Sequence, residues 1–129
     1  MLTQPEKTGA SVWIWGKDAM IDWKRVHELR SEIGLDGFAE VADMFLDEAD
    51  QAVRTLVAGL AADEVEGKLH FLKGSALNLG LADLAAICQD GERKAAAGYG
   101  ALVDVRRVAA VYHGSRAMLL QRLAVEAAA

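Results

Sequence analysis

The sequence predicts an all-α protein, an antiparallel up-and-down four-helix bundle with a short additional helix at its N-terminal end. Three observations predict this fold class. Pro5 is the only proline among the 129 residues, so no later helix is interrupted by one. Alanine and leucine are abundant, and apolar residues recur with helical rather than strand spacing. The connections between the periodic stretches are short, which favours antiparallel neighbours.

Five helices account for the periodic stretches. The first is expected over residues 21–33, because Gly34 is a natural helix stop. The second is expected over residues 36–60, where apolar side chains form one stripe. The remaining three are expected over residues 63–80, residues 81–97 and from residue 102 to near the C-terminus. Together they predict a single bundle domain over residues 20–129.

Residues 1–19 are predicted to be an extension of this domain. They contain the stretch SVWIWG, in which Trp13 and Trp15 flank Ile14. Large aromatic side chains tend to be buried, so the extension is expected to fold back over an open end of the bundle. Contact with a partner, or with a second copy of the chain, is the alternative.

Charge and cysteine content exclude several classes of function. The net charge of −5 and the lack of a Lys/Arg cluster argue against nucleic acid and anionic membranes as partners. Cys88 is the single cysteine, so neither an internal disulfide nor a cysteine-based zinc site can form. No stretch has the length of a membrane span, and the N-terminus lacks signal-peptide features. A cytoplasmic domain is expected.

His70 lies in the stretch HFLKGSALNLG, in the third predicted helix. At about 100° per residue, the centre of that helix's apolar stripe lies roughly 140° from His70. The imidazole is therefore expected to point to solvent. The stripe consists of Val65, Leu69, Leu72, Ala76 and Leu79.

The face around His70 forms a shallow, partly apolar pad on which a second protein could dock. It carries Glu66, Gly67, Gly74 and Leu77. Each glycine costs ~1 kcal/mol relative to alanine inside a helix. Since both glycines lower the stability of the helix, each is expected to have another role.

Anion chemistry suits this histidine better than the alternatives. No serine or cysteine nucleophile lies beside it. Glu66 and His70 alone do not make a metal site, and Lys73 would repel a cation, so none is expected. A neutral imidazole nitrogen is a good nucleophile, and Lys73 can pair with phosphoryl oxygens arriving on it. His27 and His113 are expected to have ordinary surface or partly buried roles.

The residues around His70 match the pattern H-x-x-K-G-[SA]-[SA]-x-x-[LIV]-G, which resembles the active-site helix of histidine-containing phosphotransfer (HPt) domains. The stretches IDWKRVHELRSEIG and FAEVADMFLDEAD are similar to the first two helices of bacterial members, and LADLAAICQDGE to the helix after the motif. The resemblance covers residues 21–126. The matched motif positions are His70, Lys73, Gly74, Ser75, Ala76, Leu79 and Gly80.

The resemblance implies a phosphorelay intermediate without kinase activity or an ATP site. His70 would take a phosphoryl group from a receiver-domain aspartate and pass it to another receiver, with Lys73 as its electrostatic partner and Gly74 giving clearance. The implied partners are response-regulator receiver domains and a hybrid histidine kinase. The receiver would hold Mg²⁺, and no cofactor is expected on this chain, which is expected to be a monomer.

Other motif positions have structural roles in the family. Ser75 and Ala76 would be small for packing against the neighbouring helix. Gly80 would end the helix, which a C-terminal cap explains equally well. Cys88 matches a frequent family cysteine and is interpreted as core filler.

Glu92 falls where several family members place a Gln or Glu against the histidine ring. A carboxylate there could hold Nδ1–H of His70 and present Nε2 as the nucleophile. A solvated glutamate at a helix end explains the residue equally well. The preceding Gly91 departs from the family, which usually has a large apolar residue at that position.

Two alternative functions stay open. One is an HPt-like adaptor that binds receiver or kinase domains without transferring phosphate; the intact set His70, Lys73 and Gly74 argues against it. The other is a dimerising histidine kinase core. The chain length and the absence of a Gly-rich nucleotide motif argue against that class.

Overall fold

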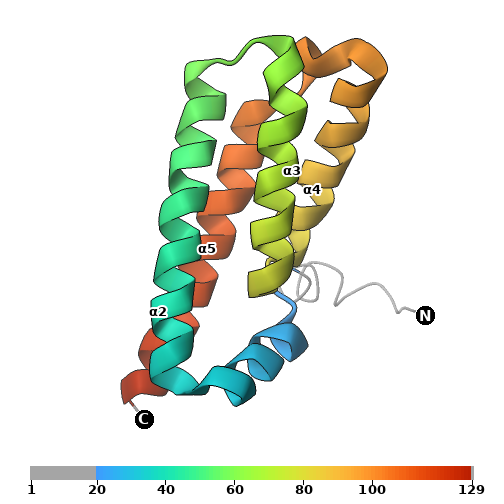
Figure 1. The fold of residues 1–129 in the computed structure, drawn as a ribbon. Coiled ribbons are helices and arrows are strands. Elements are labelled where there is room, and N and C mark those ends of the chain that lie inside the picture. The colour runs from blue at the N-terminus through green and yellow to red at the C-terminus, as the bar shows by residue number, and fades with distance from the viewer. Residues whose placement is uncertain (1–19, 129) are drawn as a thin grey trace, which may run out of the picture.

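The computed structural model describes residues 20–128, and every regular element in that range is a helix. The α-helices lie side by side, and Figure 1 shows that the direction of the chain reverses from each one to the next. The all-α fold class predicted from the sequence is confirmed for these residues. The elements in order are α2 (Trp23–Ala58), α3 (Ala62–Leu79), α4 (Ala82–Lys94), the π-helical η1 (Ala95–Tyr99), the 3-10 helix η2 (Gly100–Leu102) and α5 (Val105–Ala128).

The N-terminal end of the fold differs in detail from the prediction. The two helices expected over residues 21–33 and 36–60 form one element, α2, whose backbone leaves helical geometry at Gly34 (φ 80°, ψ 167°). Figure 1 shows the first part of α2 turned away from the rest at the foot of the bundle. The separate short helix therefore stays a prediction. So does the division at residue 20, because residues 1–19 lie outside the described residues.

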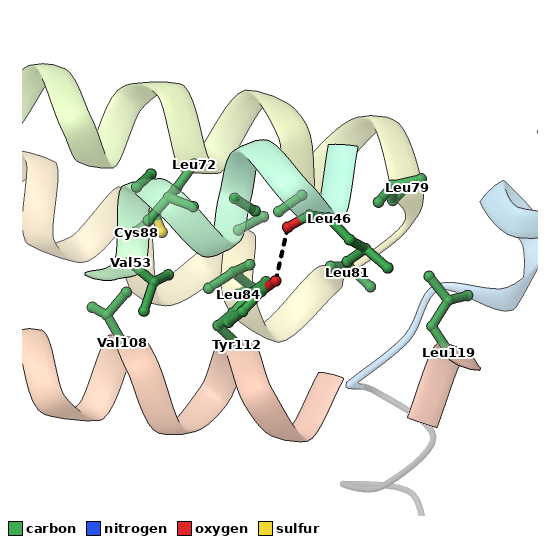
Figure 2. Packing of buried hydrophobic residues seen from close by; sticks show 14 of the residues in the cluster. Leu46, Val53, Leu72, Leu79, Leu81, Leu84, Cys88, Val108, Tyr112 and Leu119 are labelled. Carbon is green, nitrogen blue, oxygen red and sulfur yellow. Dashed lines mark hydrogen bonds between the residues drawn. The ribbon is translucent and has the colours of Figure 1, made fainter. Parts of the chain in front are cut away.

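The core is a continuous apolar cluster contributed by all four long helices (Figure 2). Tyr112 of α5 is its largest fully buried side chain. Its hydroxyl donates a hydrogen bond to the carbonyl of Leu46 at 3.0 Å and lies 3.3 Å from Oδ1 of Asp50. Burial, and then the charge of Asp50, raise the pKa of Tyr112 to about 12. The phenol therefore stays neutral and joins α5 to α2 by a satisfied buried polar contact.

The turn from α3 into α4 is formed at Gly80. Its φ of 81° lies in the left-handed region that favours glycine, and its N–H donates to the carbonyl of Ala76. Its own carbonyl accepts from the N–H of Asp22 at 2.6 Å. A Cβ at residue 80 would stand 2.8 Å from the carbonyl oxygen of Asp22. Gly80 therefore both ends α3 and lets the start of α2 pack against that end.

Gly80→Ala is expected to destabilise the fold by about 1–3 kcal/mol, because the left-handed backbone is strained for alanine and the new methyl group meets the Asp22 carbonyl. Urea denaturation followed by circular dichroism measures the effect. Gly98→Ala is the matched control, because Gly98 also has a positive φ (93°) but nothing lies within 4 Å of its Cβ position. Equal losses in the two variants would contradict a packing role for Gly80.

Candidate functional site

His70 lies in the middle of α3 with its imidazole in solvent. Its side chain is 72% exposed. The opposite stripe of α3 is buried in the core, in agreement with the helical wheel. The buried residues of that stripe are Val65, Leu69, Leu72, Ala76 and Leu79.

A carboxylate from α4 joins His70 to Lys73. Oε2 of Glu92 lies 2.9 Å from Nδ1 of His70, and Oε1 lies 2.9 Å from Nζ of Lys73. Glu92 and Lys73 are mostly covered, with side chains 15% and 24% exposed. One carboxylate thus holds the histidine ring with one oxygen and the lysine with the other.

Gly91 explains how Glu92 reaches the ring. Gly91 is buried, and a Cβ at this position would stand only 2.7 Å from Cδ1 of Leu69 and 3.3 Å from Cγ1 of Val103. A larger residue would have to displace the Leu69 side chain where α3 and α4 meet, one residue before His70. The departure from the family pattern therefore permits a close approach of the two helices.

The ionisation of Glu92 determines the tautomer of His70. Burial alone would raise the pKa of the Glu92 carboxyl, but the hydrogen bonds and charges of Lys73 and His70 outweigh it and lower the pKa from its ordinary value. Glu92 is therefore ionised at neutral pH and can only accept hydrogen bonds. Nδ1 of His70 must carry the proton, which leaves the lone pair of the neutral ring on Nε2.

The four residues predicted for docking all lie exposed on α3: Glu66, Gly67, Gly74 and Leu77. A Cβ at either glycine would meet no atom of this chain within 4 Å, so neither glycine is needed for packing within the domain. Leu77 is 58% exposed. Phe71 is also exposed. It was not among the residues predicted for docking, although it lies outside the core stripe, about 100° from His70 on the helical wheel.

The remaining motif residues are buried, and the other candidate residues lie elsewhere. Ser75, Ala76, Leu79 and Gly80 lie inside the domain. Cys88 is buried as well, and burial, followed by the charge of Glu92, raises the pKa of its thiol to about 12. His27 and His113 are exposed; His27 contacts Arg30, and His113 packs edge-on against Tyr112.

Two negative findings concern the described residues. Between residues 20 and 128, no three His, Cys, Asp or Glu side chains come together in a group that could hold a metal ion. Nor does any helix in this part of the chain combine the length and apolar character needed to cross a membrane.

The site of the described residues is thus an exposed histidine on α3 whose ring is held by a carboxylate from α4. The model of the family described as Hpt domain matches residues 40–127, from α2 beyond Gly34 through α5. The chain therefore belongs to the Hpt domain family, whose members are phosphocarrier modules for histidine phosphotransfer in phosphorelays. Members interact with receiver domains and histidine kinases. Searches of curated proteins and of solved structures returned no match.

Lys73→Met is expected to raise the pKa of the Glu92 carboxyl. Burial favours the protonated carboxyl, and the variant removes the lysine that offsets this effect. A ¹³C NMR titration of the glutamate carboxyls measures the change. Since the folded-state pKa is lowered in the wild type, Glu92 stabilises the fold above the ordinary glutamate pKa. That contribution is lost as the pH falls from the ordinary value through the lowered one, and in Lys73→Met it should be smaller and fully lost at a higher pH.

Lys94→Met is the control for this titration. It removes the exposed ion pair between Lys94 and Asp90, 3.7 Å apart on the same helix, and should leave the Glu92 titration unchanged. A Glu92 midpoint that does not move in Lys73→Met would show that the lysine does not hold the carboxylate ionised.

Proposed function

We propose that this protein is a phosphorelay intermediate in which His70 accepts a phosphoryl group from a receiver-domain aspartate and passes it to another receiver. The observation that carries the proposal is the 2.9 Å contact between Nδ1 of His70 and Oε2 of Glu92. Because Glu92 occupies Nδ1, the free and solvent-facing ring nitrogen is Nε2. That atom is the nucleophile in the proposed reaction.

The proposed transfer is a simple displacement at phosphorus. The Nε2 lone pair forms a bond to phosphorus while the bond to the aspartate oxygen breaks, and the aspartate leaves as a carboxylate with the electron pair. The ring becomes positively charged as the N–P bond forms, and the Nδ1–H···Glu92 hydrogen bond stabilises that charge. The reverse displacement delivers the phosphoryl group to the next receiver. Glu92 is thus proposed to position and polarise the ring.

Lys73 supports the same chemistry. Its ammonium group lies one turn from His70 on α3 and remains partly exposed. An ammonium group can pair with phosphoryl oxygens on Nε2 as well as with the Glu92 carboxylate, since it has three donors. We infer that Lys73 has both uses.

The surface around His70 fits the approach of a folded partner. Phe71 and Leu77 offer exposed apolar area on α3. Gly67 and Gly74 have no side chains that would cover the α3 backbone, and the space at both Cβ positions is free. A receiver could therefore bring its aspartyl phosphate close to His70 while burying these apolar side chains.

The metal ion and the kinase activity that the relay needs are assigned to other proteins. The proposal places Mg²⁺ in the acidic pocket of the receiver, and the phosphoryl group originates from a separate kinase, a hybrid histidine kinase being one candidate. This chain would supply neither ATP binding nor kinase activity, and would act as a monomer in the cytoplasm with its receivers.

His70→Gln should abolish labelling by a phosphorylated receiver, because the amide offers no nucleophilic nitrogen. Wild-type label should be acid-labile and base-stable. Autoradiography after transfer from a ³²P-labelled receiver measures it, and His27→Gln and His113→Gln, two other exposed histidines, should label as the wild type does. Labelling that persists in His70→Gln would refute the assignment. A wild type that accepts from no receiver of its source organism would favour the adaptor.

Gly74→Ala should slow transfer while stabilising the free protein. Alanine gains ~1 kcal/mol over glycine inside a helix, where the new methyl group meets no atom of this chain. Crowding of a docked receiver by the methyl group, at a cost of about 1–3 kcal/mol, would lower the second-order transfer rate by roughly 5- to 150-fold. Rapid-quench kinetics and urea denaturation measure the two effects.

Gly114→Ala is the matched control for Gly74→Ala. Gly114 lies inside α5, and its Cβ position has ordinary contacts with Met20 at 3.6 Å or more. This variant should gain stability without changing the transfer rate. Unchanged transfer in Gly74→Ala would show that the receiver does not approach the helix at this position.

A further inference from the structure

A groove runs between α4 and α5 on the side of α4 that faces away from Glu92. Its volume is about 540 Å³, and its lining mixes apolar residues, among them Ile87 and Val111, with acidic and basic ones: Asp83, Asp90, Lys94, Asp104 and Arg107. Ile87 and Asp90 lie about 140–160° around α4 from Glu92, at 100° per residue. Most of the α4 residues that line the groove therefore lie on the side opposite Glu92; Gly91, which faces Leu69 of α3, lines it as well. The volume falls within the ~300–1,000 Å³ range of sites that bind bulky groups.

The first described residue, Met20, lies at one end of this groove. Its carbonyl accepts a hydrogen bond from the N–H of Asp83 at 3.4 Å. Its thioether lies beside Gly114 of α5, where a Cβ would stand 3.8 Å from the sulfur. Asp83 lines the groove, as does Val111, one turn before Gly114. The chain before Met20 therefore joins the domain where α4 and α5 border the groove.

The residues just before Met20 have the composition to fill such a groove. The stretch VWIW, residues 12–15, places Trp13 and Trp15 two residues apart. In an extended chain, alternate side chains point to the same side, so both indoles can enter one groove. Trp15 is five residues before Met20, a reach of about 17 Å. The groove follows α4 from Asp83 to Lys94, roughly 16 Å at 1.5 Å per residue.

We propose that Trp13 and Trp15 pack into the α4–α5 groove of their own chain and brace α4 against α5. Each aromatic side chain can bury about 150–250 Å² of surface, which an apolar lining such as Ile87 and Val111 accommodates. Lys17, three residues before Met20, is within about 10 Å of chain of Asp83 and has the opposite charge to that residue.

The short tether favours this occupant over a second molecule. A segment joined through five residues to the end of the groove is present there at an effective concentration in the millimolar range. A second copy of the chain, or a partner protein, would have to compete at its own lower concentration. Because the groove lies opposite Glu92, its occupation leaves His70 open, and the proposal does not depend on phosphotransfer.

The tryptophans report directly on this contact. The chain has three tryptophans, and the third, Trp23, packs against Arg122 with 4.2 Å between the guanidinium carbon and the ring centroid. In the full-length Trp23→Phe variant, only Trp13 and Trp15 emit. Their fluorescence should be blue-shifted and protected from acrylamide relative to the same chain unfolded in urea. Emission and quenching equal to those of the unfolded chain would overturn the proposal.

A charge in the groove should release the indoles. Ala86 is exposed on α4 and lines the groove, so Ala86→Glu in the Trp23→Phe background should shift the emission to the red and increase quenching. Ala110→Glu is the matched control, because Ala110 is an exposed α5 residue outside the groove, and its emission should not change. Circular dichroism verifies that both variants are folded. Equal spectra for the two variants would overturn the proposal.

Dilution distinguishes the chain's own groove from that of a second copy. Emission that is constant over a wide dilution range, with a monomeric mass by light scattering, supports packing within one chain. A red shift on dilution, together with a dimeric mass at high concentration, would overturn it in favour of exchange of residues 1–19 between two copies.

Discussion

The contact between Leu69 of α3 and Gly91 of α4 is the constraint on which the site depends. Glycine fits the observed spacing without displacing the leucine side chain, because a Cβ would stand 2.7 Å from its Cδ1. The residue after Leu69 is His70, and the residue after Gly91 is Glu92. Since each functional side chain directly follows one member of the contact, the packing that joins the two helices also sets the 2.9 Å distance between ring and carboxylate.

The carboxylate of Glu92 can hold the His70 ring only because it stays ionised between two donors, the Lys73 ammonium and Nδ1–H of His70. A carboxylate covered to this extent without partners would tend to protonate, and a protonated carboxyl can donate as well as accept. It would then no longer require the proton on Nδ1 of His70. Lys73 lowers the pKa of Glu92 and so acts on the histidine ring through it. The tautomer that exposes Nε2 is therefore a property of three residues together.

Periodicity within one helix was sufficient to predict the orientation of His70, because burial of the apolar stripe leaves only one outward face. The end of α3 was also predictable, since Gly80 both stops the helix and occupies a left-handed backbone position. The reach of Glu92 was not predictable in this way, because a pattern within one helix contains no information about the distance to the next. That distance depends on Gly91. The helix predicted over residues 81–97 is α-helical to Lys94 and continues as the π-helical η1.

The precision of the site therefore depends on both sides of α4. This helix has 13 residues, a length at which an isolated helix is marginal in water, so its position must come from packing. On one side α3 supplies that packing through Leu69 and Gly91. On the other side the groove leaves part of the contact with α5 unfilled. Any group that occupies the groove restricts the movement of α4, and with it the position of the Glu92 carboxylate against His70, without covering the face on which a receiver would dock.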